Sequence, residues 1–280
     1  MKFAKYQALG NDYIVVEPLQ SCEGLSPQMA RWLCDRHYGI GSDGVLLGPF
    51  SDVYCDFSLR LYNPDGGEFE KSGNGLRIFA RYLWDRGLVS DRPFTLRTAG
   101  GDVCCRVHAG GSKVTIEMGF VRFHSKVIPV LGPEREVLDE VLKIEDREFR
   151  ISAATIGNPH CVVLCDDISS QIAREWGPLI ETHPMFPHRT NVQFMKVLDR
   201  SNIQIEIWER GAGYTLASGS SSCAAAATAY RLGLCDREIS VHVPGGRLEV
   251  SLTPDCMAVL EGPVTKICEG IVFEEAMQYD

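Results

Sequence analysis

The sequence predicts an α/β fold of two pseudo-symmetric lobes, each a mixed β-sheet wrapped around a central buried helix. Three observations predict it: a long-range internal repeat, strand-like runs of alternating hydrophobicity, and one strongly apolar helical segment in each copy. We expect an N-terminal lobe at 1–120, a C-terminal lobe at 121–262, and a tail at 263–280 that returns to the N-terminal lobe. The active site is expected in the cleft between the lobes.

The internal repeat joins two stretches that each place a serine and a glycine before an apolar segment. "EKSGNGLRIFARYL" and "LASGSSSCAAAATAY" align when Ser72 is paired with Ser218. In the same alignment Gly73 meets Gly219, and Gly87 meets Gly233. Further upstream, "ALGNDYIVV" faces "TIGNPHCVV". An ordered series of this kind across half the chain indicates two copies of one unit of domain size.

Each copy contains strand and helix signals in the same order. The runs "FSLRLY" and "IQIEIW" alternate with the period of a half-buried strand. The segments "GLRIFARYLWDRG" and "SSCAAAATAYRLG" predict buried helices, with Gly87 and Gly233 as their C-terminal caps. Residues 124–150 carry many charges, two prolines and little periodicity, so they are expected to form a connection and surface excursion.

Composition excludes several classes of function. The net charge of the 280 residues is -9, and no long basic run is present, which argues against nucleic-acid binding. No apolar run has membrane-spanning length, and the N-terminus lacks the apolar region of a signal peptide. The eleven cysteines have no metal-binding spacing and are expected to be reduced thiols in a cytoplasmic protein. We expect no metal and no cofactor.

A serine before a helix can have a structural role or a functional role. It is a favoured N-cap, and that structural role alone explains a single Ser-Gly pair. Here, however, Ser72 and Ser218 are followed by small residues, which leave the first helical N–H groups open to an anion. Two such helix starts facing one cleft would hold a carboxylate and flank the neighbouring carbon, an arrangement that suits proton removal from that carbon. Thiols would suit this chemistry better, because a serine hydroxyl needs a partner base.

Six motifs together resemble the diaminopimelate epimerase family over nearly the whole chain. They are "KYQALGNDYIVVE", "DRHYGIGSDG", "NPDGGEFEKSGNGLRIFARY", "IGNPHCVV", "RTNVQFM" and "ERGAGYTLASGSSSCAAA". The resemblance implies a cofactor-independent enzyme of lysine biosynthesis that converts LL-diaminopimelate to the meso form, with two cysteines as base and acid. It also implies two pseudo-symmetric lobes, in agreement with the repeat.

The resemblance assigns roles to matching positions in this chain. Ser72 and Ser218 occupy the positions of the two catalytic cysteines, which implies impaired or altered activity. Two further positions depart from the family pattern: Tyr214 replaces a glutamate and Ser221 replaces a glycine. Whether the two serines are natural or introduced stays open. The resemblance implies substrate binding by Asn11, Asn63, Gly73, Asn74, Asn158, Asn191, Glu209, Arg210, Gly219 and Ser220.

Two more residues are candidates for supporting roles, and two alternative functions stay open. His160 and Tyr214 are expected to lie behind the residues that touch the substrate. The expected partner is a small zwitterionic amino acid, since amides suit both its charges and arginine clamps a carboxylate. We expect no nucleic-acid or membrane partner, whereas a homodimer is possible. The alternatives are an isomerase, dehydratase or racemase for another small amino or hydroxy acid, and a catalytically silent amino-acid binder.

Overall fold

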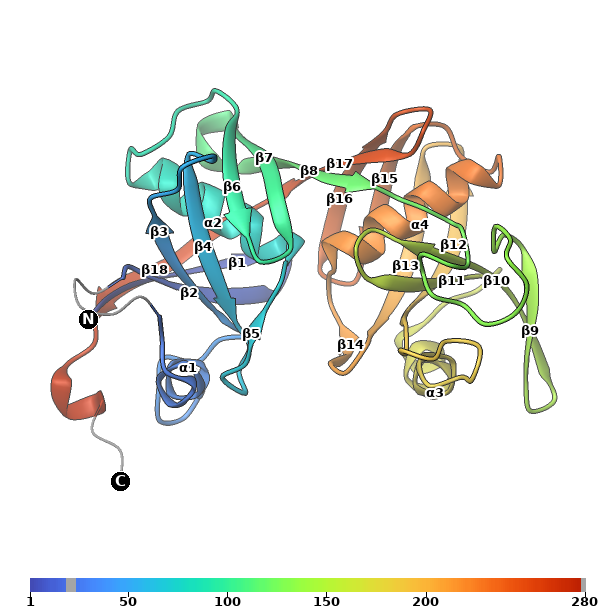
Figure 1. The fold of residues 1–280 in the computed structure, drawn as a ribbon, viewed down its shortest axis with the longest axis horizontal. Coiled ribbons are helices and arrows are strands. Elements are labelled where there is room, and N and C mark those ends of the chain that lie inside the picture. Colours follow the sequence, from blue (N-terminus) through green and yellow to red (C-terminus); the bar gives the residue numbers. More distant parts are fainter. Residues whose placement is uncertain (19–23, 278–280) are drawn as a thin grey trace. The chain divides into compact units, whose positions relative to one another are not determined.

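A computed structural model describes residues 1–18 and 24–277, and it divides the chain into two compact units (Figure 1). The first unit comprises Met1–Ile116 with Gly262–Asp280, and the second comprises Glu117–Glu261. The boundaries fall within two strands, β8 (Lys113–Phe120) and β17 (Met257–Pro263). In the described part of the chain, no helix is both long enough and apolar enough to cross a bilayer.

The first unit is a mixed sheet with two helices. Most neighbouring strands are antiparallel, but β2 pairs with β3 and β4 pairs with β6 in parallel. Strand β18 returns to this unit and pairs antiparallel with β1. The elements are β1 (Lys2–Ala8), β2 (Asn11–Val16), α1 (Pro27–Cys34), β3 (Val45–Phe50), β4 (Phe57–Tyr62), β5 (Glu68–Phe69), α2 (Gly73–Asp85), β6 (Phe94–Thr98), β7 (Gly101–His108), η1 (Ala109–Gly111), β8, β18 (Thr265–Ile271) and η2 (Glu274–Met277).

The second unit repeats this topology. Strands β11 and β12 are parallel with a helix between them, and so are β13 and β15, as in the first unit. The elements are β9 (Glu140–Ile144), β10 (Arg147–Thr155), β11 (Pro159–Leu164), α3 (Ser170–Glu181), β12 (Asn191–Asp199), β13 (Asn202–Glu209), β14 (Gly213–Thr215), α4 (Gly219–Arg231), β15 (Glu238–Val243), β16 (Gly246–Leu252) and β17.

The predicted fold class is confirmed, because each unit surrounds one buried helix with strands. Helix α4 is built from small residues and contacts β10, β11, β12, β13, β15 and β16. In the first unit, α2 contacts β1, β2, β3 and β7. The predicted caps are also confirmed: Gly87 and Gly233 have φ of 70° and 72°, a left-handed conformation that glycine adopts without strain.

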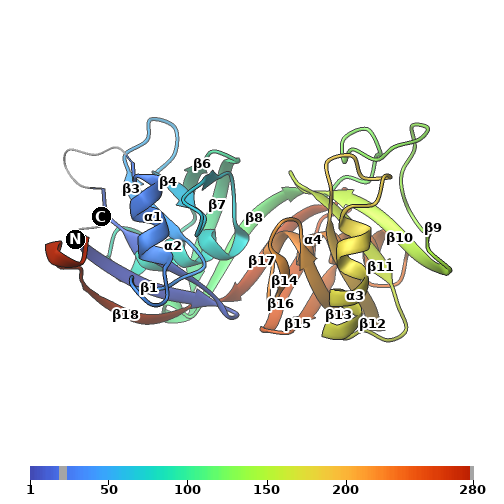
Figure 2. The same cartoon turned by 90° about the horizontal axis from the view of Figure 1, so that it is seen from below.

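The sheet of each unit lies between two helices, one of which sequence analysis did not predict. In the second unit, α3 packs with the apolar side chains of Val192 and Phe194 on one face of β12. The intervening Gln193 points to the opposite face, where it bonds to Ser221 of α4. Figures 1 and 2 show α1 in the corresponding place in the first unit. Helices α1 and α3 begin at Ser26 and Ser169, whose hydroxyls accept capping hydrogen bonds.

One sequence expectation is wrong. Residues 124–150 do not form only a surface excursion, because this segment contains β9 and the beginning of β10. It also buries six apolar side chains in an apolar cluster of the second unit, namely Ile128, Val130, Val137, Leu142, Ile144 and Phe149. The many charges hid these positions, and the first three are too irregularly spaced to produce a helix or strand pattern.

Candidate active site

In the first unit, the candidate site is the start of α2. Ser72 is its N-cap, and the Ser72 hydroxyl accepts a hydrogen bond of 3.0 Å from the Gly75 N–H. The Tyr13 hydroxyl lies 3.4 Å from the same oxygen. The cap occupies the N–H of the third helical residue, and the other N–H groups of the first turn point out of the helix end. The start of α2 therefore combines a hydroxyl with amides suited to an anion.

In the second unit, the start of α4 has the same form. Ser218 is the N-cap, and its hydroxyl accepts a longer hydrogen bond of 3.4 Å from the Ser221 N–H. The carboxyl group of Glu209 lies near the Ser218 and Thr215 side chains. Removal from water raises the pKa of Glu209 above its ordinary value, and the two neighbouring side chains oppose that shift more weakly.

The two helix starts differ in the group beside the serine. In the alignment of the two copies, the counterpart of Glu209 is Asn63, which lies in the turn between β4 and β5. Its backbone closes that turn through Gly66 and Gly67, and its side chain forms no hydrogen bond with the described residues. Within its own unit, Ser218 therefore has a carboxyl partner and Ser72 has a phenol partner.

The structure joins Asn11 to Asn74 in the first unit. The Asn74 side-chain amide donates to Asn11 Oδ1 at 3.0 Å, and Asn11 Nδ2 donates to Asp43 Oδ2 at 2.9 Å. The fully buried Arg77 donates to Asn74 Oδ1 at 2.8 Å. Both amides are thus held in one orientation by charged neighbours.

The second unit joins Asn191 to Arg210. Asn191 is buried, and its Nδ2 donates to the Pro159 carbonyl at 2.8 Å. Its Oδ1 accepts a hydrogen bond of 3.0 Å from the Arg210 N–H. The guanidinium of Arg210 donates to the His188 carbonyl at 3.1 Å and is otherwise exposed. Asn191 therefore holds the loop that carries Arg210.

Asn158 lies beside the start of α4. Its Nδ2 is 3.5 Å from the hydroxyl of Ser220, and its Oδ1 is 2.9 Å from Nε2 of His160. His160 is fully buried, and burial lowers the pKa of its imidazole to about 3. The imidazole is thus neutral at physiological pH and supports the Asn158 amide.

Tyr214 is held away from acid–base work. Its hydroxyl donates to the Glu206 carboxylate at 2.6 Å, and the Arg174 guanidinium lies over its ring, 4.3 Å from the centroid. Burial and the hydrogen bond with Glu206 raise the pKa of Tyr214 to about 12. A phenol in this state is a poor base at neutral pH.

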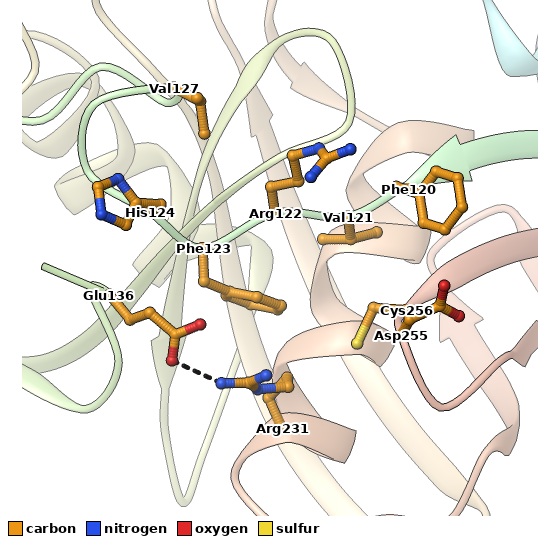
Figure 3. A pocket seen from close by; sticks show the side chains of 10 residues that line it. All are labelled: Phe120, Val121, Arg122, Phe123, His124, Val127, Glu136, Arg231, Asp255 and Cys256. Carbon is orange, nitrogen blue, oxygen red and sulfur yellow. Dashed lines mark hydrogen bonds and ion pairs between the residues drawn. The ribbon is translucent and has the colours of Figure 1, made fainter.

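A separate hollow of about 280 Å³ lies in the second unit (Figure 3). Its lining includes Phe120, Arg122 and Cys256, as well as Arg231, which donates to Glu136 at 2.6 Å. It contains none of the predicted site residues. Among the described residues, no group of three or more His, Cys, Asp or Glu side chains is arranged to hold a metal ion.

Comparison with protein-family models identifies a match to diaminopimelate epimerase over residues 3–124 and 152–267. The chain belongs to the diaminopimelate epimerase family. Diaminopimelate epimerase 2 of Nostoc sp. is 57% identical over 270 residues, which cover 96% of this chain and 95% of the relative. Diaminopimelate epimerase of Synechococcus sp. is 40% identical over 278 residues, which cover 96% of this chain and 97% of the relative.

Solved structures outside the close relatives share the fold of this diaminopimelate epimerase family member. A hydroxyproline epimerase from Agrobacterium vitis aligns with a TM-score of 0.66 and 17% identity, covering 96% of this chain and 91% of the other. A PhzF-family phenazine biosynthesis protein from Bacillus anthracis aligns with a TM-score of 0.66 and 14% identity, covering 98% and 99%. At these identities the likeness concerns the fold alone.

Sequence analysis did not single out the residues that hold the candidate side chains in place. Gln193, Arg77 and Asp43 each contact a predicted site residue or its neighbour. The sequence does contain a signal for two of these residues: Gln193 interrupts a strand of apolar residues, and Arg77 interrupts the apolar face of α2. A polar residue at a core position requires a polar partner.

Proposed function

We propose that this protein binds diaminopimelate and transfers the α-proton as an epimerase between the LL and meso forms. One observation supports this most strongly: pseudo-equivalent serines cap α2 and α4, at the two positions that the sequence resemblance assigns to catalytic thiols. Membership in the family supports the choice of substrate. As expected of the family, the reaction would need no pyridoxal phosphate.

Each helix start offers N–H groups that would bind a carboxylate. The first N–H groups of α2 and α4 belong to Gly73, Asn74, Gly219 and Ser220. Oriented amides of this kind stabilise the negative charge that develops on the carboxylate when the α-proton leaves. Arg210 would bind a second carboxylate, since its guanidinium is exposed and its backbone is fixed by Asn191.

Proton transfer would be slow and unequal at the two serines. A hydroxyl is a much weaker acid than a thiol, so it exchanges a proton only with the help of a partner base. In the second unit the carboxyl group of Glu209 lies beside Ser218 and would act as this base. In the first unit the neighbour of Ser72 is the hydroxyl of Tyr13, which is no better as a base.

Exchange of the α-proton in deuterated buffer tests the proposal. Wild-type protein, Ser72→Cys, Ser218→Cys and the double variant are incubated separately with LL- and meso-diaminopimelate. We expect binding by all four and the fastest exchange by the double variant. Failure of the wild-type protein to bind either isomer would contradict the proposal.

Two observations favour the alternative functions. The serine pair and Tyr214 at a family glutamate position favour an isomerase, dehydratase or racemase for another small amino or hydroxy acid. The weak acidity of both hydroxyls favours a silent amino-acid binder. NMR with a panel of amino and hydroxy acids distinguishes them: a new substrate changes chemically, whereas a bound but inert ligand exchanges no proton.

We further propose a cytoplasmic homodimer. Apolar side chains exposed on and after β18 support self-association, namely Ile267, Ile271 and Phe273, which are 51%, 61% and 70% exposed. Analytical ultracentrifugation of wild-type protein and Ile271→Lys tests the dimer. A monomeric wild-type protein at micromolar concentration would contradict it.

A further inference from the structure

A chain of four hydrogen-bonded side chains lies between the sheet of the second unit and α4. Ser221, Gln193 and His160 are each fully buried, and Asn158 forms the partly exposed end. His160 and Gln193 lie on adjacent parallel strands, β11 and β12, on the face that packs against α4. Because the three inner residues are buried, the polar atoms of the chain pair with one another, except for Gln193 Oε1, which has no hydrogen-bond partner among the described residues.

The donor and acceptor chemistry of the chain determines the position of the imidazole proton. Gln193 Nε2 lies 3.1 Å from His160 Nδ1 and donates to Ser221 Oγ at 3.0 Å. An amide nitrogen can only donate, so Nδ1 of His160 carries no proton. The other ring nitrogen, Nε2, lies 2.9 Å from Asn158 Oδ1, an acceptor, and must carry the proton.

This arrangement determines which end of the Asn158 amide is available to a ligand. Its oxygen is occupied by the imidazole N–H. Among the described residues, its Nδ2 has only the Ser220 hydroxyl at 3.5 Å, the outer limit of a hydrogen bond. A protonated imidazole is disfavoured, because a second N–H would meet the Gln193 amide, in agreement with the lowered pKa of His160.

We propose that Gln193 is a positioning residue that, through one neutral tautomer of His160, presents the Asn158 amide to the ligand as a hydrogen-bond donor. The ligand group at this point is then an acceptor such as a carboxylate oxygen, and not an ammonium group. The identity of the ligand rests on the proposed function. The tautomer of His160 and the orientation of Asn158 do not depend on the proposed function.

Nitrogen-15 NMR of the full-length protein tests the tautomer without any ligand. We expect the signals of a neutral imidazole protonated at Nε2, with no titration between pH 8 and about 5, given a pKa of about 3. Protonation at Nδ1, or titration near the ordinary value of histidine, would overturn the proposal.

A pair of substitutions separates positioning from packing. Gln193→Met keeps the volume but removes the donor, so either tautomer forms and affinity for meso-diaminopimelate falls about tenfold. Gln193→Glu stabilises an imidazolium that still donates from Nε2 to Asn158, so affinity is retained at pH 7 while the pKa of His160 rises. If Gln193 acted only through packing, Gln193→Glu would lower the affinity more than Gln193→Met, because a buried carboxylate disrupts packing more than methionine does. That result would contradict the proposal.

Matched controls complete the experiment. Gln204→Met and Gln204→Glu make the same changes on β13, at a partly exposed residue, and should leave affinity and the His160 signals unchanged. If neither Gln193 variant folds, Ser221→Ala removes the other partner of the Gln193 amide and should give a mixture of tautomers. If wild-type protein binds no diaminopimelate, the proposed function fails, whereas the NMR spectrum of wild-type protein still decides the inference.

Discussion

At the scale of single residues, Glu209 distinguishes the start of α4 from the start of α2. Its carboxyl group lies beside the Ser218 side chain, and its pKa is above the ordinary value because the group is removed from water. A carboxyl group accepts a proton only when ionised, so proton transfer through it must increase as the pH rises through this elevated pKa. The first unit has asparagine at the corresponding position.

We predict that Glu209→Gln slows α-proton exchange at Ser218 and removes the associated pH dependence. The expected loss is about 10²- to 10⁴-fold, the usual contribution of a general base. Exchange rates in deuterated buffer between pH 5 and 8 measure it. Glu175→Gln, which makes the same change at an exposed position of α3, is the matched control. An unchanged pH profile in Glu209→Gln would exclude Glu209 as the base.

The same substitution has a consequence for stability. The folded-state pKa of Glu209 is higher than the unfolded one, so between the two values the native protein binds more protons. The free energy of unfolding therefore decreases as the pH rises through this interval. Glu209→Gln should flatten that dependence in urea unfolding curves recorded across the acidic range.

His160 produces the opposite dependence. Its folded-state pKa of about 3 lies below the ordinary value of 6.5, so between them the unfolded chain binds more protons. Stability from His160 is present above 6.5 and is lost as the pH falls toward 3. We predict that wild-type protein loses up to about 2 kcal/mol more than His160→Gln between pH 7 and 5, measured by urea unfolding. Equal losses would contradict a buried neutral imidazole.

At the scale of elements, the helix starts combine capping with the proposed chemistry. The capping bond of Ser72 is shorter than that of Ser218, 3.0 Å against 3.4 Å. A thiol is a weaker acceptor than a hydroxyl, so cysteine at either position would cap less well. Serine therefore favours a stable helix start, and cysteine favours proton transfer.

We predict that Ser72→Ala costs about 1 kcal/mol of unfolding free energy and Ser218→Ala costs less. Urea unfolding monitored by circular dichroism measures both. Ser26→Ala, at the cap of α1, is a control without a proposed catalytic role; its hydroxyl accepts at 3.1 Å. A larger cost at Ser218 than at Ser72 would show that the difference in capping distance does not govern stability.

Sequence patterns predicted the buried helices and their glycine caps because these signals are local. A serine cap, an uninterrupted run of small residues and a glycine that requires positive φ determine α4 almost alone. Helices α1 and α3 were missed, since α1 is short and α3 contains Gly177 and Pro178, which weaken helix patterns. Their apolar faces become clear only once the sheet beneath them is known.

Sequence patterns predicted less of the candidate site. The asparagines and serines could be named from motifs, but their partners depend on which strands are adjacent. Gln193 and His160 are 33 residues apart in the chain and meet because β11 and β12 pair in parallel. The orientation of Asn158 follows from that contact, and no periodicity in the sequence predicts it.

At the scale of the whole molecule, the chain repeats one topology in two units but gives them different chemistry. Strand–helix–strand segments with parallel pairing occur at corresponding places in both, and each central helix begins with serine. The partners of the serines differ, a phenol in the first unit and a carboxyl group in the second. The proposed two-base reaction requires both serines. Its rate is therefore limited by the serine with the weaker neighbouring base, Ser72.

The most direct measurement of this claim is α-proton exchange and inversion of LL-diaminopimelate in deuterated buffer by the Ser72→Cys/Ser218→Cys double variant. Ser222→Cys, which places a thiol further inside α4, is the matched control. We predict that the double variant converts LL- to meso-diaminopimelate with solvent deuterium at the inverted carbon, far faster than wild type or the control. A double variant that folds and binds diaminopimelate yet neither exchanges nor inverts would contradict the account.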